Sequence, residues 1–298
     1  MASTGSTADP WTEAWPDGYG FFEAPVLPST SDTARERAEA GEAGPLWIRA
    51  DRQSAGRGRR GRPWTSPSGN LFATLLLRPA CSASIAAQLS YVTALAVADV
   101  VSLALPGAPV GLKWPNDVRV AGAKIAGILL ESGGSGRGPD PAPAPARAQA
   151  ARSDLPPPDL RPRDPRPWLA IGVGLNIATH PGDAGYPTTS LSSAGAVPLP
   201  SVGAAMAALA RRMDHWLTLW DAGTGFGGIR AAWLDRAEGL GGPLEARLPK
   251  GSVRGRFTGL DEAGGLILSL ADGSDRIIHG GEVFFPDADA EAVPAPDR

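Results

Sequence analysis

The stretch of sequence that most limits how this chain can fold is residues 132–167. It reads SGGSGRGPDPAPAPARAQAARSDLPPPDLRPRDPRP. Proline at this density removes backbone N–H donors, and the segment has too little apolar surface to form a core. We therefore predict an exposed, partly extended insertion, to which we assign no role. The folded structure must be built from the residues on either side of it.

The sequence on both sides of the insertion predicts a mixed α/β domain over residues 20–238. Apolar runs bounded by glycine and proline indicate strands, and longer runs at helical spacing indicate helices. The helices are expected at 28–44, 84–105, 201–220 and 225–238, and the strands at 45–50, 70–79, 110–120, 123–131 and 168–178. Ser31 or Asp32 could cap the first helix, and Ala121-Gly122 predicts a hairpin turn.

The last part of the chain has a different pattern. Residues 242–285 alternate short apolar runs with glycine turns, which is typical of a small β-barrel. We place this second domain at 239–286. Residues 1–19 are expected to be flexible, and the acidic, proline-bearing tail at 287–298 to be disordered.

Composition excludes several classes of protein. The 298 residues carry a net charge of −3, which argues against broad affinity for nucleic acid or membrane surfaces. The apolar run 84–105 is interrupted by Gln88 and Asp99, so we expect a buried helix rather than a membrane span. Cys81 is the single cysteine, which excludes an intramolecular disulfide and a cysteine-based zinc site and suits a reducing cytoplasm. The three histidines lack metal-ligand spacing, so no side-chain metal site is expected.

The loop GRGRRGRPW at 56–64 predicts anion binding. Glycines let the backbone approach a ligand, and arginines offer planar forks for carboxylate and phosphate. Pro63 follows where a dinucleotide or P-loop motif would need a helix, which disfavours both. An RNA-binding basic loop remains an alternative. Because four like charges are crowded together, we expect the empty loop to be mobile and to close over a bound anion.

Three further segments carry polar groups in apolar surroundings. In KWPNDV, Lys113 could bridge a substrate carboxylate and a phosphate. In GVGLNI, Gly172 and Gly174 leave one face of a strand bare, so a ligand or a neighbouring strand must lie flat against it. In PSTS, at 28–31, the hydroxyls could hold a small polar ligand.

Taken in order, these segments resemble biotin–protein ligases. The matching pieces are STS before a helix, RQSAGRGRRGRPW, SGNLFATLLLRP, KWPNDV, KIAGILLE and GVGLNI, followed by a small barrel. The resemblance implies a mixed-sheet catalytic domain of the biotin/lipoate ligase type and an SH3-like β-barrel. It also implies an enzyme that forms biotinyl-5′-AMP from biotin and ATP and transfers biotin to one lysine of a carboxylase carrier domain. Because nothing before residue 28 suits a winged helix, the form without a DNA-binding domain is expected.

The resemblance also implies roles for individual residues. Lys113, Arg57 and Arg59 would be catalytic. The biotin-binding residues would be Ser29, Thr30, Ser31, Gln53, Gly56, Arg57, Gly58, Arg59, Lys113, Gly127, Leu129 and Gly172. The ATP-binding residues would be Arg59, Arg62, Trp64, Asn116, Lys124 and Asn176, with Mg²⁺ carried on the phosphates. Ser31 stands where the family commonly has asparagine, and Pro63 where a basic residue is frequent.

Several points stay open on the sequence alone. A lipoate–protein ligase would share the catalytic fold and also join a carboxylic acid to a lysine. The expected protein works in the cytoplasm as a monomer or a homodimer, without nucleic acid or membrane.

Overall fold

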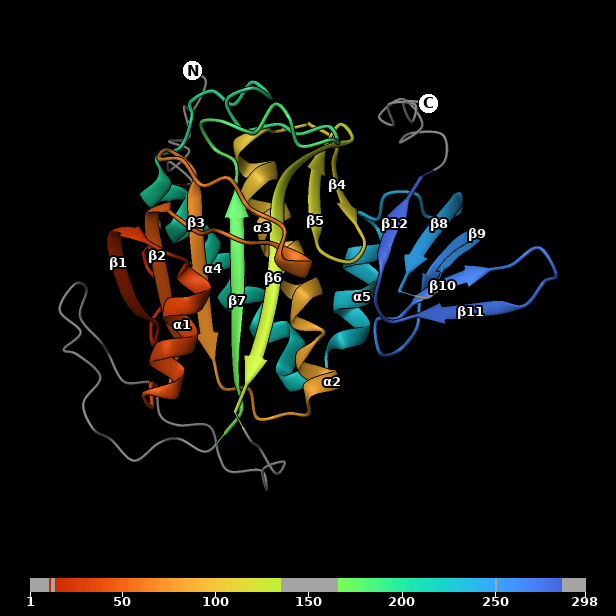
Figure 1. The fold of residues 1–298 in the computed structure, drawn as a ribbon, viewed down its shortest axis with the longest axis horizontal. Helices are drawn as coiled ribbons and strands as arrows, with labels where there is room; N and C mark the ends of the chain where they lie inside the picture. Colours follow the sequence, from red (N-terminus) through yellow and green to blue (C-terminus); the bar gives the residue numbers. More distant parts are fainter. Residues whose placement is uncertain (1–10, 12–13, 135–165, 250, 286–298) are drawn as a thin grey trace, which may run out of the picture.

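The computed structural model describes residues 11, 14–134, 166–249 and 251–285. The predictions for residues 1–10, for most of the insertion at 132–167 and for the tail at 287–298 lie outside the described residues. Figure 1 shows a large sheet covered by helices on both faces, with a smaller sheet beside it at the C-terminal end. The predicted order, a mixed α/β domain followed by a small all-β domain, is confirmed.

The large sheet has seven strands in the order β1-β2-β3-β7-β6-β5-β4. Its strands are β1 (Gly20–Leu27), β2 (Leu46–Gln53), β3 (Leu71–Leu77), β4 (Val110–Lys113), β5 (Asp117–Val120), β6 (Ala123–Gly133) and β7 (Trp168–Leu175). The β1–β2 pair is parallel and the others are antiparallel. The central strands β3 and β7 are apolar along almost their whole length because helices cover both of their faces.

The helices form one layer on each face of this sheet (Figure 1). The helix α1 (Thr30–Glu39) packs on β2, β3 and β7. The opposite layer contains α3 (Leu89–Ala104), α4 (Val202–Trp220) and α5 (Phe226–Leu234), and the short helix α2 (Ala83–Ala86) precedes α3. The sequence predicted one helix over 84–105, but the structure has two, separated at Ala87 and Gln88. The expected helix over 225–238 ends earlier, at Leu234.

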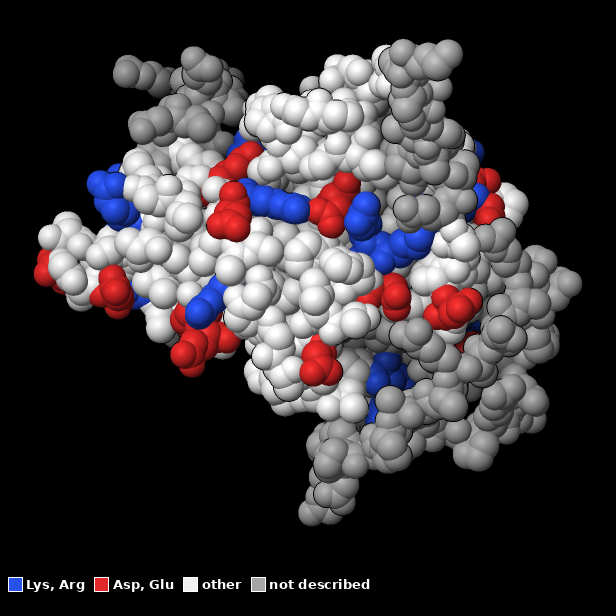
Figure 2. Space-filling view, turned by 180° about the vertical axis from the view of Figure 1, so that it is seen from behind, with Lys and Arg blue, Asp and Glu red and all other residues white. Residues whose placement is uncertain are grey.

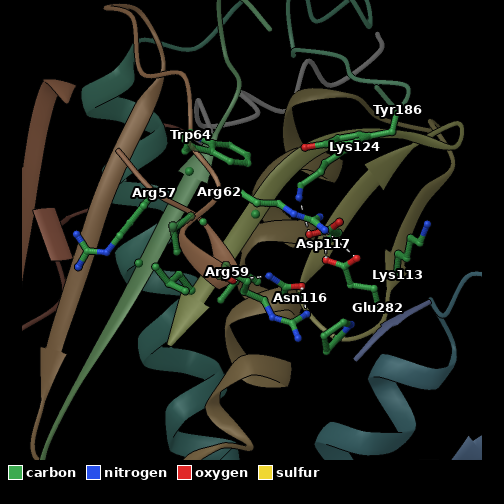
Figure 3. A pocket seen from close by; sticks show the side chains of 18 of the residues that line it. Arg57, Arg59, Arg62, Trp64, Lys113, Asn116, Asp117, Lys124, Tyr186 and Glu282 are labelled. Atoms are coloured by element: carbon green, nitrogen blue, oxygen red, sulfur yellow. Dashed lines mark hydrogen bonds and ion pairs between the residues drawn. The ribbon is translucent and has the colours of Figure 1, made fainter. Parts of the chain in front are cut away.

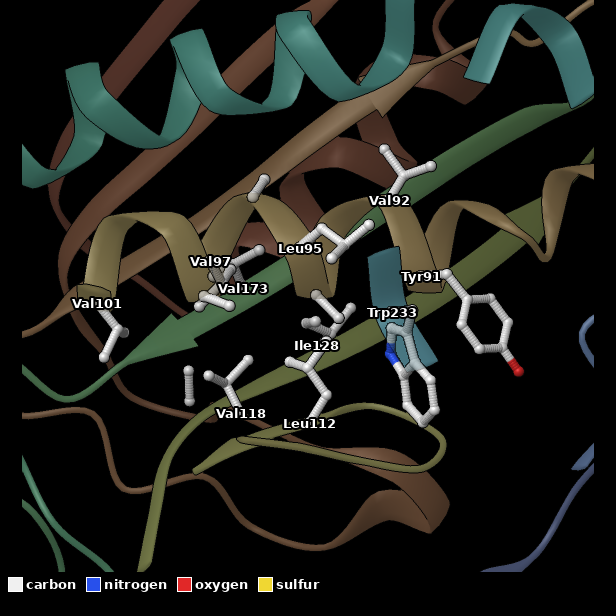
Figure 4. Packing of buried hydrophobic residues seen from close by; sticks show 14 of the residues in the cluster. Tyr91, Val92, Leu95, Val97, Val101, Leu112, Val118, Ile128, Val173 and Trp233 are labelled. Atoms are coloured by element: carbon white, nitrogen blue, oxygen red, sulfur yellow. The ribbon is translucent and has the colours of Figure 1, made fainter. Parts of the chain in front are cut away.

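The helix α3 forms the centre of the core. Val92, Leu95 and Val101 are each completely buried, and α3 contacts α4, β6 and β7; Figure 4 shows these side chains in the core with Ile128 of β6 and Val173 of β7. The segment Ala83–Ala104 is long and apolar enough to cross a membrane, but 72% of its most apolar window is buried inside the protein. The predicted buried helix is therefore confirmed.

The N-terminal segment is more ordered than the sequence predicted. Trp15 packs edge-on against Phe21 of β1, with ring centroids 5.0 Å apart. The Tyr19 hydroxyl donates to Asp214 of α4 at 3.2 Å. Part of the segment expected to be flexible, residues 14–19, thus makes tertiary contacts with β1 and α4. Their aromatic side chains have apolar surface to bury, which the composition of the first residues obscured.

The segment 110–120 is a hairpin rather than one strand. β4 and β5 pair antiparallel across the turn at Trp114, Pro115 and Asn116, because proline lacks the N–H that a continuing strand would need. The second turn follows the prediction. Ala121 and Gly122 both have positive φ, at 48° and 80°, as a two-residue hairpin between β5 and β6 requires.

The second sheet has five antiparallel strands in the order β11-β10-β9-β8-β12. These are β8 (Pro243–Leu248), β9 (Gly251–Leu260), β10 (Leu266–Ser269), β11 (Asp275–Ile278) and β12 (Glu282–Phe284). Leu244, Phe257, Leu268 and Val283 form its interior, each at most 3% exposed. The alternation of buried and exposed residues along β8 and β9 is the period-two pattern of a half-buried sheet.

Replacing Arg78 with methionine is expected to lower the free energy of unfolding by about 3 kcal/mol. The Arg78 guanidinium donates to the carbonyls of Ala38, Glu42 and Arg166, so it satisfies the C-terminal end of α1 and joins it to the start of β7. Urea denaturation followed by tryptophan fluorescence measures the change. Arg276→Met, at an exposed position of β11, is the control. Equal midpoints for the two variants would contradict the assigned role.

Candidate active site

A cavity of about 270 Å³ lies between the large sheet and the C-terminal barrel. Its walls come from the N-terminus of α1, the loop after β2, the β4–β5 turn, β6, β7, a loop at 185–187 and the barrel strands β8 and β12. Figure 3 shows Lys113, Lys124 and Glu282 on the barrel side of this space and Arg57 on the opposite side, with Trp64 lying across β6 and β7. The cavity therefore has chemically different ends.

The wall formed by α1 carries uncharged polar groups. Ser29, Thr30 and Ser31 are at most 6% exposed. The Thr30 backbone N–H and hydroxyl both donate to Gln53 Oε1, at 2.8 and 3.1 Å. Ser29 is the N-terminal cap residue, but its side chain makes no capping hydrogen bond, so the predicted cap by Ser31 or Asp32 is wrong. Gln53 takes up the first N–H of this helix instead.

The floor of the cavity is formed by glycines of β6 and β7, which have no side chains. A methyl group added at Gly174 would lie 2.6 Å from the Trp64 indole, and one added at Gly127 would lie 3.0 Å from the same ring. At Gly172 the added group would lie 2.9 Å from Ser31 Oγ. Where the sequence analysis expected a ligand or a neighbouring strand, the structure places side chains of the protein: the Trp64 ring lies against Gly127 and Gly174, and Ser31 lies against Gly172.

The glycine-arginine loop is anchored by Arg57. Its guanidinium donates to both carboxylate oxygens of Asp32, at 2.6 and 2.9 Å, and reaches Glu131 at 3.1 Å. The bidentate hydrogen bond from Arg57 holds the pKa of Asp32 below its ordinary value of 3.8. Because the carboxyl pKa is lower in the folded state, this tether is present at higher pH and is lost as the pH falls through the shifted value.

The other three arginines of the loop reach the C-terminal barrel. Arg59 donates to the Gly281 carbonyl at 3.0 Å, and burial lowers its pKa from the ordinary value. Arg62 pairs with Glu282 at 2.8 Å, and Arg60 with the same carboxylate at 3.7 Å. The expected mobility of the empty loop rested on crowded like charges, and the structure shows that acidic groups from both domains compensate these charges.

Lys113 lies at the barrel end of the cavity. It is the last residue of β4 and stands opposite Asp117 in the hairpin register. Its ammonium lies 5.0 Å from the Phe285 ring centroid and 5.5 Å from that of Phe284. A cation held over aromatic faces, at the end of a strand, is positioned to meet an anion in the cavity.

Lys124 provides a second cation, from β6. Its ammonium pairs with Asp117 at 2.7 Å and lies between the rings of Trp64 and Tyr186, at 5.4 and 5.5 Å. Asn116 accepts a hydrogen bond from Arg59 at 3.1 Å and donates to the Ile128 carbonyl at 2.6 Å. The β4–β5 turn therefore links the loop to β6.

The β4–β5 turn is also joined to the barrel through Tyr91 of α3. The Trp114 indole N–H donates to the Tyr91 hydroxyl at 2.9 Å, and that hydroxyl donates to the Gly264 carbonyl. Burial raises the pKa of Tyr91 well above its ordinary value, so the phenol stays protonated and can donate.

Replacing Tyr91 with phenylalanine is expected to lower the free energy of unfolding by about 2 kcal/mol, because the Trp114 N–H and the Gly264 carbonyl lose their partner in buried surroundings. Thermal denaturation measures the change. Tyr19→Phe removes a hydroxyl bound to Asp214 at 3.2 Å in a part-buried setting and should cost less. A larger loss for Tyr19→Phe would count against the proposed link.

Most of the residues predicted for the site line one cavity. These are Ser29, Thr30, Ser31, Gln53, Arg57, Gly58, Arg59, Arg62, Trp64, Lys113, Asn116, Lys124, Gly127, Leu129 and Gly172. Two do not. Gly56 lies against Ser66 and the Trp64 carbonyl, and Asn176 is 2% exposed, with its amide donating to the Thr189 carbonyl. For Asn176, this contact indicates a role in holding the loop after β7.

Several lining or anchoring residues were not predicted. Asp32 and Glu131 flank predicted residues, and Glu131 stands out as a charge in an apolar strand. Arg247 and Glu282 come from the barrel and line the cavity, but no local pattern marks them because their contacts span many residues of chain. Within the described residues, no group of three or more His, Cys, Asp or Glu side chains could hold a metal ion.

Two families match this architecture domain by domain. Residues 23–138 match the Biotin/lipoate A/B protein ligase family, and residues 239–285 match the Biotin protein ligase C terminal domain. The first match covers both biotin and lipoate ligases. The second is a domain of biotin protein ligases, and it therefore favours biotin over lipoate.

Whole-chain relatives narrow the class further. A biotin–[acetyl-CoA-carboxylase] ligase of Paracoccus denitrificans is 40% identical over 87% of this chain and 99% of its own length. The bifunctional ligase/repressor BirA of Bacillus subtilis is 31% identical over 85% of this chain and 70% of its own length. The chain belongs to the biotin protein ligase family.

A solved structure agrees in fold. The biotin protein ligase from Aquifex aeolicus, in complex with biotin and ATP, covers 89% of this chain and 97% of its own, with a TM-score of 0.68 at 23% identity. The predicted fold class, a catalytic domain of the biotin/lipoate ligase type followed by a small SH3-like domain, is thus confirmed.

Proposed function

We propose that this protein joins biotin to ATP, forming biotinyl-5′-AMP and pyrophosphate, and then transfers the biotinyl group to one lysine of a biotin carboxyl carrier domain. The observation that carries the proposal is the division of a single cavity. One end is lined by uncharged polar groups, the buried Thr30 and Ser31 and the half-buried Gln53, and the other by the cations Lys113 and Lys124. A ligand with a neutral polar head and a carboxylate tail fits the first end, and a polyphosphate fits the second.

In the first step, a biotin carboxylate oxygen attacks the α-phosphorus of ATP. A new P–O bond forms, the bond from the α-phosphorus to the β-bridging oxygen breaks, and pyrophosphate leaves. Both reactants are anions, so the protein must offset their repulsion. Lys113 and Arg59 line the cavity and supply fixed positive charge there. Mg²⁺ would arrive on the phosphates and reduce their charge.

In the second step, the amine of an acceptor lysine attacks the acyl carbon of biotinyl-5′-AMP. A C–N bond forms, the acyl C–O bond breaks, AMP leaves, and the amine loses a proton. The mixed anhydride is easily hydrolysed, so water must be kept away before the acceptor arrives. The loop anchored by Arg57 covers the cavity and serves this purpose.

The proposed partner is the biotin carboxyl carrier domain of an acetyl-CoA or acyl-CoA carboxylase, and the proposed location is the cytoplasm. Nucleic acid is not part of the proposal. The arginines of the basic loop lie in ion pairs and hydrogen bonds, and on the reverse face basic and acidic side chains are interspersed among the described residues (Figure 2).

Mass spectrometry tests the proposal directly. A carrier domain incubated with this protein, biotin and Mg-ATP should gain the mass of one biotinyl group, and should gain nothing when ATP is omitted. Replacing biotin with lipoate is the control for the related ligase class. Modification by lipoate at a comparable rate, or no modification by biotin, would overturn the assignment.

A further inference from the structure

Thr74, on β3, is completely buried and does not line the cavity, yet it contacts two residues that do. Its hydroxyl lies 2.8 Å from Thr30 Oγ1 and 3.3 Å from Ser31 Oγ. In the sheet register Thr74 stands opposite Gly172. A side chain at Gly172 would press on Ser31 Oγ, at 2.9 Å, so the glycine keeps open the position from which Ser31 reaches Thr74.

The direction of each hydrogen bond here follows from counting protons. The Thr30 backbone N–H can only donate, so the Gln53 atom 2.8 Å from it must be the amide oxygen. That oxygen also receives the single hydroxyl proton of Thr30. Thr30 must then accept from Thr74, which uses the single proton of Thr74. In the remaining pair, Ser31 must donate to Thr74.

The other end of the same network is fixed as well. Gln53 Nε2 donates to Ser66 Oγ at 3.1 Å, and Ser66 donates to the Trp64 carbonyl, which can only accept, at 2.8 Å. The Thr30 backbone N–H and the Trp64 carbonyl thus fix the direction of every hydrogen bond in this network.

This orientation decides what the cavity offers a ligand. The Ser31 proton points away toward Thr74, so Ser31 Oγ presents only lone pairs to the cavity. Both lone pairs of Gln53 Oε1 are occupied by Thr30, while one proton of Nε2 is left to donate. Ser31 and Gln53 both line the cavity, so its uncharged end offers a ligand one acceptor and one donor.

We infer that Thr74 is a positioning residue that sets this polarity and thereby selects a ligand head with an N–H beside a carbonyl, as in a cyclic urea. The inference rests on the proposed function and deepens it. A serine hydroxyl without Thr74 could rotate and act as donor or acceptor, which would weaken discrimination. A ligand head without N–H or carbonyl groups, such as a dithiolane ring, would leave the lone pairs of Ser31 Oγ and the second proton of Gln53 Nε2 unpaired, and is disfavoured.

Calorimetric titration of biotin and of ATP into the full chain tests the inference. Thr74→Val keeps the shape of the side chain but removes the hydroxyl, and it should raise the Kd for biotin about tenfold while leaving the Kd for ATP unchanged. Thr74→Ser keeps the hydroxyl and should restore most of the affinity. Thr93→Val is the matched control, because Thr93 is also completely buried and donates to the Leu89 carbonyl, away from the cavity.

A double-mutant cycle separates positioning from packing. If Thr74 acts through Ser31, then Thr74→Val should have a much smaller effect on biotin affinity in a Ser31→Ala background. Unchanged biotin affinity in Thr74→Val, equal weakening of biotin and ATP, or full additivity in the cycle would each overturn the inference alone. A wild-type protein that binds no biotin would instead overturn the proposed function, and the inference with it.

Discussion

Replacing Lys113 with alanine is expected to slow biotinyl-5′-AMP formation by about 10²- to 10³-fold. Lys113 lines the cavity at its cationic end, with its ammonium over the rings of Phe284 and Phe285. A charge held in place stabilises the transition state, in which negative charge concentrates between the carboxylate and the α-phosphate, more than it stabilises the separate substrates. The loss should therefore fall mainly on kcat, measured as pyrophosphate release.

The control for this prediction is Arg254→Ala. Arg254 pairs with Glu245 on the barrel, its side chain is 81% exposed, and it does not line the cavity. Its removal changes the net charge by the same amount and should leave the rate within about twofold, as expected for an exposed pair. A Lys113→Ala rate within tenfold of the wild type would show that Lys113 is not the group that neutralises the reacting anions.

Replacing Arg57 with glycine is expected to release biotinyl-5′-AMP into solution, so that lysines of unrelated proteins become biotinylated. Arg57 ties the loop to Asp32 and Glu131. Losing charge-assisted hydrogen bonds of this kind typically costs about 1.5–3 kcal/mol, which shifts the loop toward open states by tenfold or more. Streptavidin blotting of a bystander protein, with no carrier domain present, measures the release.

Two further variants separate the tether from the loop itself. Asp32→Asn leaves every loop residue in place but removes the charge that Arg57 grips, and it should give the same release in milder form. Arg35→Ala is the control, because Arg35 pairs with the same carboxylate at 3.0 Å from within α1 and does not belong to the loop. Bystander labelling that does not rise in Arg57→Gly, or that rises equally in Arg35→Ala, would show that the tether does not seal the cavity.

The parts of the fold predicted well from the sequence are those set by local pattern. The apolar runs of β3 and β7 identify central strands because helices cover both faces. The pair Gly172 and Gly174 predicted a bare strand face from period two alone. β1 was missed because Pro25 interrupts it, and the structure shows why proline is tolerated there, since β1 is an edge strand with one unpaired side.

The site was predicted as a set of residues but not as a set of contacts. Local pattern brought Arg57, Lys113 and Gly127 to notice. It could not show that Arg57 is held by Asp32 and Glu131, because these partners lie 25 and 74 positions away in the chain. Contacts of this kind depend on the tertiary fold, and the carboxylates that compensate the charge of the loop were missed for the same reason.

The glycine-arginine loop at 56–64 is held by ion pairs at two places, and these differ in strength. At the biotin end of the cavity, Arg57 pairs with two carboxylates and its side chain is 25% exposed. At the barrel end, Arg62 pairs with Glu282 and its side chain is 62% exposed. Solvent weakens the outer fastening far more than the inner one. We therefore expect Arg62 to separate from the barrel before Arg57 separates from its carboxylates, with Arg59 still bonded to Gly281, so the loop opens first at its outer edge. Opening at this edge would let pyrophosphate leave while biotinyl-5′-AMP remains covered by the inner part of the loop.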